Sequence, residues 1–262
     1  MRRRGLPIKL IIGAAIALFA VAKYCSSATT NPYTGKKQHI SISPKEEVAI
    51  GLSSAPAMAQ QHGGLYPDTR YQQVVDLIGK KLVDNSIAKQ SGYPFEFHLL
   101  RDDRVINAFA LPGGQVFITY ALFSRLTNPD GTLNQDMLAG VLGHEIGHVI
   151  GRHSAARMAK QDLTQGLLSG AAVGFDPSTA QGAAAIANVI NMKYGREDEL
   201  ESDELGVKLM IDAGYNPEAL IGVMEILKQA AGPNRVPEFQ STHPNPENRM
   251  AKIKEAIRKY RK

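Results

Sequence analysis

The sequence predicts an α+β fold that is mostly helical, with one small antiparallel sheet. Several segments repeat apolar residues at the three-to-four-residue spacing of amphipathic helices and begin with typical helix caps. Stretches with strand character are confined to residues 93–120. The 262 residues are 44% hydrophobic and 21% charged, which suits one globular domain and excludes a disordered or collagen-like chain.

Residues 1–28 are expected to be a signal peptide or a short N-terminal anchor. Three arginines at residues 2–4 precede an apolar run of 13 residues, Leu10–Ala22. A signal-peptide core needs about 7–15 apolar residues, whereas a membrane-spanning helix needs about 20. Cys25 adds a lipoprotein as a third option, although Lys23-Tyr24 stands where a lipoprotein signal has small residues. All three options place the body outside the cytoplasm, in the periplasm or cell envelope.

The net charge of +5 comes mostly from this N-terminal segment. Without residues 1–22 the chain has 26 basic and 25 acidic side chains. The near-neutral body gives no support for nucleic-acid binding. The single cysteine excludes an intramolecular disulfide.

After a polar linker at residues 29–42, one domain is expected to occupy residues 43–262. Helix starts are marked by Ser43-Pro44 and Asn216-Pro217, because a capping side chain followed by proline suits a first turn. The Gly/Ala-rich residues 165–190 are expected to form either a mobile hairpin over the site or two packed helices. The expected helices begin at Pro44 and Pro217 and cover residues 68–84, 134–160, 197–213 and 245–262.

Three strands are expected between residues 93 and 120. Residues 93–100 alternate apolar and polar side chains, as in a half-buried strand. Residues 105–111 and 115–120 flank a Pro-Gly-Gly turn, which indicates an antiparallel hairpin.

The strongest chemical signal is the HExxH motif, residues 144–148. His144 and His148 are four residues apart, so on a helix both imidazoles lie on one face and can bind one zinc ion. Glu145 is turned about 100° from His144. It can reach a water molecule at the ion and act as the general base.

Four glycines lie on the same expected helix, at residues 140, 143, 147 and 151. A glycine within a helix costs roughly 1 kcal/mol relative to alanine. Close approach of a second helix or strand to this stripe would offset the cost.

Two patterns compete for the third metal ligand. The metzincin pattern needs a histidine where Ser154 stands; His153 is one residue early and, on a continuous helix, points nearly opposite to His144. The gluzincin pattern needs a glutamate four residues before an aspartate, which Glu199 and Asp203 supply.

The gluzincin pattern fits a second helix facing the first. Glu199, Asp203 and Gly206 share one helix face, whereas Glu201 lies about 200° from Glu199. Glu199 would bind the metal, and Asp203 would hold a ligand histidine by its other ring nitrogen. A merely acidic, solvated helix face is the competing explanation.

Across residues 34–255 the sequence resembles the zinc metallopeptidases that include HtpX, the CAAX prenyl proteases and the mitochondrial Oma-type proteases. The resemblance rests on Thr34-Gly35-Lys36, Asn107-Ala108-Phe109, Leu111-Pro112-Gly113-Gly114, His144–His148, Glu199–Asp203 and Thr242-His243-Pro244. It implies a gluzincin-type domain with the small sheet beside the HExxH helix. The implied ligands of one Zn²⁺ per chain are His144, His148 and Glu199, with Glu145 as base. Ser202 stands where the family often has alanine, and the missing multi-span membrane domain favours the exported branch.

The resemblance also places His243 near the metal. Its side chain would either stabilise the oxyanion of the tetrahedral intermediate or occupy the open metal position in a resting enzyme. Arg249, six residues later, is expected either to support His243 or to be a surface cation.

These observations predict a zinc metalloendopeptidase that cleaves unfolded or misassembled envelope proteins. An uncleaved N-terminal segment would add contact with a membrane. The alternative is a holdase-like binding protein with a latent or structural zinc site, although a structural site does not need a base such as Glu145. The strand at residues 107–111 is expected to lie beside the cleft and to bind extended peptides by strand addition.

Overall fold

The computed structural model describes residues 8–174, 195–230, 239, 243 and 248–261. The chain divides into two compact units. Unit 1 takes in Met1–Ser43 and Ala155–Met192, and unit 2 takes in Pro44–Ser154 and Lys193–Lys262. Most of the Gly/Ala-rich stretch, from residue 175 onward, and the expected helix start at residues 245–247 lie outside the described residues.

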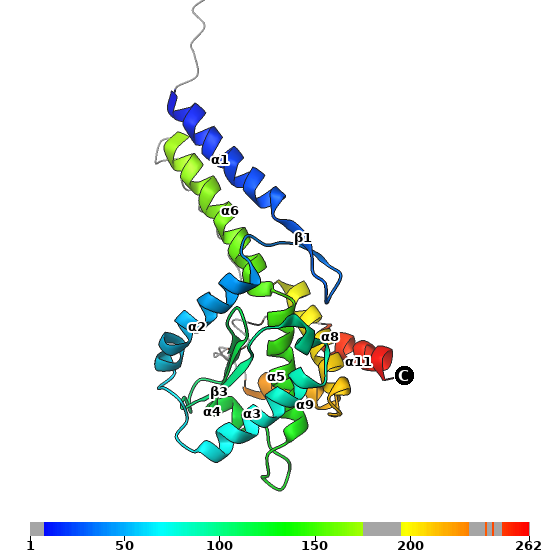
Figure 1. Cartoon of the computed structure of the whole chain (residues 1–262). Coiled ribbons are helices and arrows are strands. Elements are labelled where there is room, and N and C mark those ends of the chain that lie inside the picture. Colours follow the sequence, from blue (N-terminus) through cyan, green and yellow to red (C-terminus); the bar gives the residue numbers. More distant parts are fainter. Residues whose placement is uncertain (1–7, 175–194, 231–238, 240–242, 244–247, 262) are drawn as a thin grey trace, which may run out of the picture. The chain divides into compact units, whose positions relative to one another are not determined.

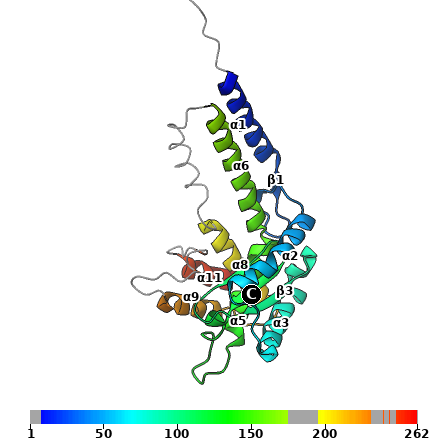
Figure 2. The same cartoon turned by 90° about the vertical axis from the view of Figure 1, so that its left-hand side faces the viewer.

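Unit 1 is built on two long helices, α1 (Ile8–Ser26) and α6 (His153–Gly174), the latter joining it from residue 155 onward. The two helices run side by side in both views (Figures 1 and 2). A Cβ atom at Gly166 would lie 2.4 Å from the Cβ of Ala20, so only glycine allows this approach. The stretch expected as a linker contains the antiparallel strands β1 (Ala28–Thr30) and β2 (Lys37–His39).

Unit 2 contains the other helices of the described residues. Asp68 and Asn134 cap α3 and α5 by accepting backbone N–H bonds, as their short polar side chains favour. The expected helix positions are reproduced within a few residues, apart from the break described below. The elements are α2 (Pro44–Gln61), α3 (Thr69–Asp84), the 3₁₀ helix η1 (Ile87–Ser91), α4 (Tyr120–Phe123), α5 (Gln135–Ile150), α8 (Arg196–Asp212), α9 (Ala219–Ala230) and α11 (Arg249–Tyr260).

The sheet of unit 2 has the strand order β3 (Glu96–Leu100), β5 (Gln115–Thr119), β4 (Ala108–Ala110). The expected hairpin is present, because β4 pairs antiparallel with β5. β3 pairs with β5 in parallel, so the sheet is mixed rather than wholly antiparallel. The hairpin folds β5 back into the centre, where all five of its residues are buried. Helix α5 contacts both β4 and β5.

The expected continuous helix over residues 134–160 is wrong, since the chain breaks between α5 and α6. Arg152 has a φ of 57°, in the left-handed region. This conformation costs a non-glycine residue roughly 1–2 kcal/mol. The Arg152 guanidinium donates to the Glu47 carboxylate at 2.9 Å, and Tyr93 donates to the same oxygen at 2.7 Å. Because Glu47 is buried, these bonds hold the break in place.

Two glycines of the stripe, Gly143 and Gly147, face α8, as the sequence predicts, whereas Gly140 faces Leu220 of α9. A Cβ at Gly147 would lie 2.9 Å from the backbone oxygen of Ser202, and a Cβ at Gly143 would lie 3.4 Å from that of Gly206. Figure 1 shows α8 lying along α5. The glycines thus bring the two helix backbones close enough for their side chains to share one site.

Candidate metal centre

Helices α5 and α8 bring three potential metal ligands together. The Nε2 atoms of His144 and His148 are 3.1 Å apart. The Glu199 carboxylate lies 3.5 Å from His144 Nε2 and 3.4 Å from His148 Nε2. All three side chains are at most 2% exposed. They form a buried metal-binding group.

His243 completes this group from the segment that precedes α11. Its Nδ1 lies 3.0 Å from Glu199 and 3.4 Å from His144 Nε2. The ring of Phe239 stacks on His243 at 4.4 Å, and the backbone oxygen of Phe239 accepts the His243 N–H. Tetrahedral zinc with bonds of 2.0–2.1 Å separates its ligand atoms by about 3.3 Å. The 3.0–3.5 Å spacings therefore fit one ion held by three nitrogens and one oxygen.

Glu145 is buried beside the four potential ligands. It is 0% exposed, and neither carboxylate oxygen has a hydrogen-bond partner among the described residues. His243 Nε2 lies 3.7 Å from one of its oxygens. Burial raises the pKa of Glu145 above its usual value. A buried carboxylate with free lone pairs suits proton transfer to and from a water molecule.

Asp203 and Arg249 support the cluster from behind. Asp203 accepts a hydrogen bond from His144 Nδ1 at 2.9 Å, which directs His144 Nε2 toward the other ligands. Arg249 donates to both Asp203 oxygens and lies 3.3 Å from Glu199. Burial raises the pKa of Asp203, but the Arg249 charge and the His144 hydrogen bond outweigh it and hold that pKa below its usual value.

The two motif histidines differ in their protonation. Burial holds the pKa of His148 well below its usual value, so the ring is neutral. Burial acts in the same direction on His144, but its hydrogen bonds to Asp203 and Glu199 outweigh it and raise the pKa to about 9. A ligand imidazole must be deprotonated, so a divalent cation would displace the extra proton of His144, whereas the neutral His148 and the ionised Glu199 need lose none.

The structure brings all seven site residues predicted from the sequence into one buried group and places two further residues against it. The seven are His144, Glu145, His148, Glu199, Asp203, His243 and Arg249. His153, expected to point nearly opposite to His144, lies with its Nδ1 2.9 Å from His148 Nδ1. Glu201 lies 3.1 Å from His153 Nε2. Gly151, the C-cap of α5, is the sequence feature that could have indicated a helix end at this point. The other three histidines, His39, His62 and His98, contact Tyr24, Asp102 and Gln115 respectively.

The chain was compared with protein families and with curated proteins. Residues 69–257 match the model of peptidase family M48. The beta-barrel assembly-enhancing protease of Escherichia coli is 31% identical over 95% of this chain and 51% of its own length. The mitochondrial metalloendopeptidase OMA1 of Schizosaccharomyces pombe is 27% identical over 94% of this chain and 69% of its own length. The chain thus spans about half the length of the bacterial protein.

The family match covers more than half of the chain and includes the HExxH motif, Glu199 and Asp203. The mostly helical fold and the buried metal-binding group agree with it. The chain therefore belongs to peptidase family M48.

Proposed function

We propose that this chain is a zinc-dependent endopeptidase that hydrolyses unfolded or misassembled proteins of the cell envelope. The observation that carries the proposal is the buried cluster of His144, His148, Glu199 and His243, with Glu145 beside it. Two imidazoles and a carboxylate are the donor set of catalytic zinc sites. The similarity to a bacterial protease named for beta-barrel assembly supports an envelope substrate.

Within this site each residue has a distinct task. A bound zinc ion would polarise the scissile carbonyl and lower the pKa of a water molecule. Glu145 would accept a proton from a water molecule in the site and deliver it to the leaving amine. Asp203 fixes the ring of His144 through the Nδ1–H bond. Arg249 balances the buried negative charge of Asp203 and Glu199.

Of the two roles open for His243, the geometry favours the resting cap. Its Nδ1 is 3.0 Å from the Glu199 carboxylate and lies among the ligand atoms, where a fourth ligand would sit. A catalytic zinc site keeps this fourth position for water or substrate. His243 must therefore withdraw before cleavage, and the resting enzyme has low activity.

The sheet edge formed by β4 supports binding of extended peptides. β4 is the last strand in its sheet, so one edge carries no strand partner within the described part of the chain. It also contacts α5, which carries the HExxH motif. A peptide added to this edge would bind through its main chain, with little demand on its sequence.

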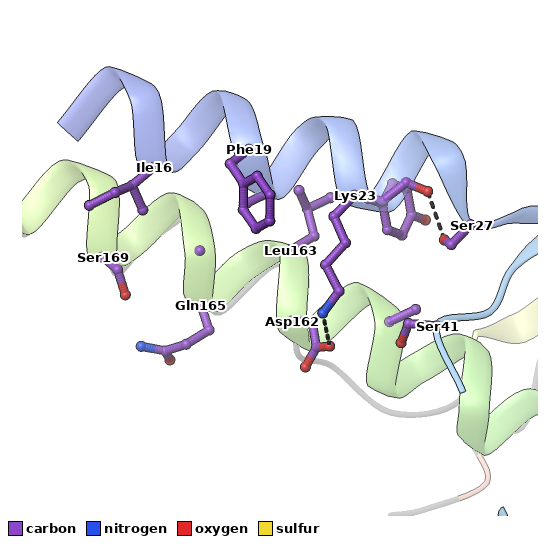
Figure 3. Close-up of a pocket in the computed structure, with 13 residues that line it drawn as sticks. Ile16, Phe19, Lys23, Ser27, Ser41, Asp162, Leu163, Gln165 and Ser169 are labelled. Carbon is purple, nitrogen blue, oxygen red and sulfur yellow. Dashed lines mark hydrogen bonds and ion pairs between the residues drawn. The ribbon is translucent and has the colours of Figure 1, made fainter. Parts of the chain in front are cut away.

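Helix α1 supports a membrane anchor in unit 1. It is long and apolar enough to cross a membrane, with a mean hydropathy of 1.9, and it exposes apolar side chains such as Leu18 and Phe19, at 69% and 72%. Lys23 pairs with Asp162 of α6 at 3.2 Å, beside a cavity of about 360 Å³ (Figure 3). These contacts join α1 to α6 within unit 1. They favour an anchor that stays attached to the protein rather than a signal peptide that is cleaved off.

Cleavage of an unfolded protein such as casein tests the proposed activity. Wild-type protein should cleave it, a chelator should stop cleavage, and added Zn²⁺ should restore it. A chelator-insensitive activity, or casein binding without cleavage at any metal concentration, would refute the proposal and favour a holdase-like role.

Trapping of bound envelope proteins by a Glu145→Gln variant in cells tests the substrate class. Extraction with carbonate and the mass of the mature N-terminus test the anchor.

A further inference from the structure

A chain of polar contacts runs from the metal-binding group through two residues that the proposed mechanism does not use. His148 Nδ1, on the side of the ring away from the other ligands, lies 2.9 Å from His153 Nδ1. The opposite nitrogen of His153, Nε2, lies 3.1 Å from a carboxylate oxygen of Glu201. His153 is 3% exposed, and the Glu201 side chain is 11% exposed.

With both rings neutral, these contacts are satisfied by one arrangement of the protons. An ionised carboxylate only accepts hydrogen bonds, so the proton at the Glu201 contact belongs to His153 Nε2. A neutral His153 then has a lone pair on Nδ1, and this atom accepts the Nδ1–H of His148. The remaining nitrogen of His148, Nε2, keeps its lone pair, and it is this atom that lies 3.1 Å from His144 Nε2.

The backbone is built to place His153 at this position. The left-handed Arg152, held by Glu47, ends α5 and turns the next residue back toward His148. Gly151 supplies the space, because a Cβ there would lie 2.6 Å from His153 Nε2. Ser202 adds a longer contact, 3.3 Å from His153 Nδ1, that can support the same ring orientation.

We propose that His153 and Glu201 are positioning residues that hold His148 in the tautomer and ring orientation needed to bind the metal. The inference rests on the proposed metallopeptidase function. It gives His148 a counterpart to the Asp203 contact of His144, although with a neutral imidazole between ligand and carboxylate. Groups that orient a ligand in this way typically change metal affinity by about 10–100-fold when they are removed.

Zinc affinity of the full-length protein, measured by competition with a chromophoric chelator, provides the main test. His153→Ala should weaken zinc binding by about 10–100-fold. His153→Asn should recover most of the loss, because its amide oxygen can accept near the former Nδ1 position. Glu201→Gln should bind zinc nearly as well as wild type, since its amide oxygen also accepts, whereas Glu201→Ala should bind more weakly. Glu204→Ala is the matched control, because Glu204 is on the same helix but contacts Lys259 and Tyr260.

The tautomers of His148 and His153 provide a second measurement. It would not change if His153 and Glu201 only stabilised the fold. Long-range ¹H–¹⁵N spectra of the zinc-loaded, ¹⁵N-histidine-labelled protein should show His153 protonated at Nε2 and His148 protonated at Nδ1. Glu201→Ala should give His153 a mixture of tautomers while the fold, seen by circular dichroism, stays intact. The spectra of wild type and of Glu201→Ala still test the proposal if His153→Ala does not fold.

The outcomes separate this inference from the proposed function. If wild-type protein binds no zinc, the proposed function itself fails. If wild type binds zinc and His153→Ala and Glu201→Ala bind it within twofold, only the positioning role is refuted. A His153 protonated at Nδ1 alone would also refute it. So would a second zinc equivalent lost in Glu201→Ala, because His153, Glu201 and Asp198 would then hold an ion of their own.

Discussion

Replacing Arg249 with methionine would remove the positive charge that the buried carboxylates share. Arg249 is 1% exposed, and Asp203 and Glu199, its partners, are 1% and 0% exposed. Breaking a buried ion pair by removing one partner costs about 3–5 kcal/mol, because the other charge stays buried without compensation. We therefore expect the free energy of unfolding of metal-free Arg249→Met to fall by about 3–5 kcal/mol.

The loss should be smaller in the zinc-loaded protein, because the ion supplies positive charge next to Glu199. Urea unfolding of both forms, followed by circular dichroism, measures the two values. Arg258→Met, on the exposed face of the same helix, is the control and should change stability by less than about 0.5 kcal/mol. Arg249→Lys should recover only part of the loss, since lysine keeps the charge but not the paired donation to Asp203. A change below about 1 kcal/mol in both forms of Arg249→Met would refute the charge balance described here.

Three further predictions concern the cap, the helix contact and the loop that follows β3. His243→Ala should raise basal casein cleavage, because it opens the fourth ligand position; a drop in kcat of about 10²–10³ would instead assign His243 to the oxyanion. Gly147→Leu should destabilise the fold by about 1–3 kcal/mol in urea unfolding, since even a Cβ meets the Ser202 backbone at 2.9 Å, and an unchanged midpoint would contradict the α5–α8 contact. Burial raises the pKa of Asp102, but hydrogen bonds from backbone N–H groups and His62 outweigh it and lower that pKa overall. The stability that Asp102 contributes is therefore present above its unfolded pKa of about 3.9 and lost as pH falls through its folded pKa, so Asp102→Asn should lower Tm at pH 7 and less below pH 4; an equal loss at both pH values would contradict this.

Three members of the metal-binding group could be predicted from sequence because helix periodicity and the gluzincin pattern together indicate them, whereas His243 was indicated only by the family resemblance. His144 and His148 lie one turn apart on α5, and Glu199 and Asp203 lie one turn apart on α8. The glycine stripe then indicated that two helices meet on this face. No long-range information beyond the facing of two regular helices was needed.

The contact of His153 with His148 could not be predicted in the same way. Apolar residues on both sides of Arg152 favour a continuous helix, which would point His153 away from the site. The break depends on Glu47, about 100 residues earlier in the chain, whose carboxylate binds Arg152 only once α2 has packed. The parallel pairing of β3 with β5 also escaped prediction, because a local hairpin signal says nothing about which edge a third strand joins.

The most direct test of the central claim compares the zinc content and the casein cleavage of two glutamate variants with those of wild type. We expect Glu145→Gln to keep one zinc per chain and to lose nearly all cleavage, because Glu145 acts on water and is not a ligand. Glu199→Gln should lose both, since a neutral amide replaces the charged ligand that lies 3.4–3.5 Å from the two histidine nitrogens. Zinc lost from Glu145→Gln, or full zinc and cleavage in Glu199→Gln, would refute the assigned roles.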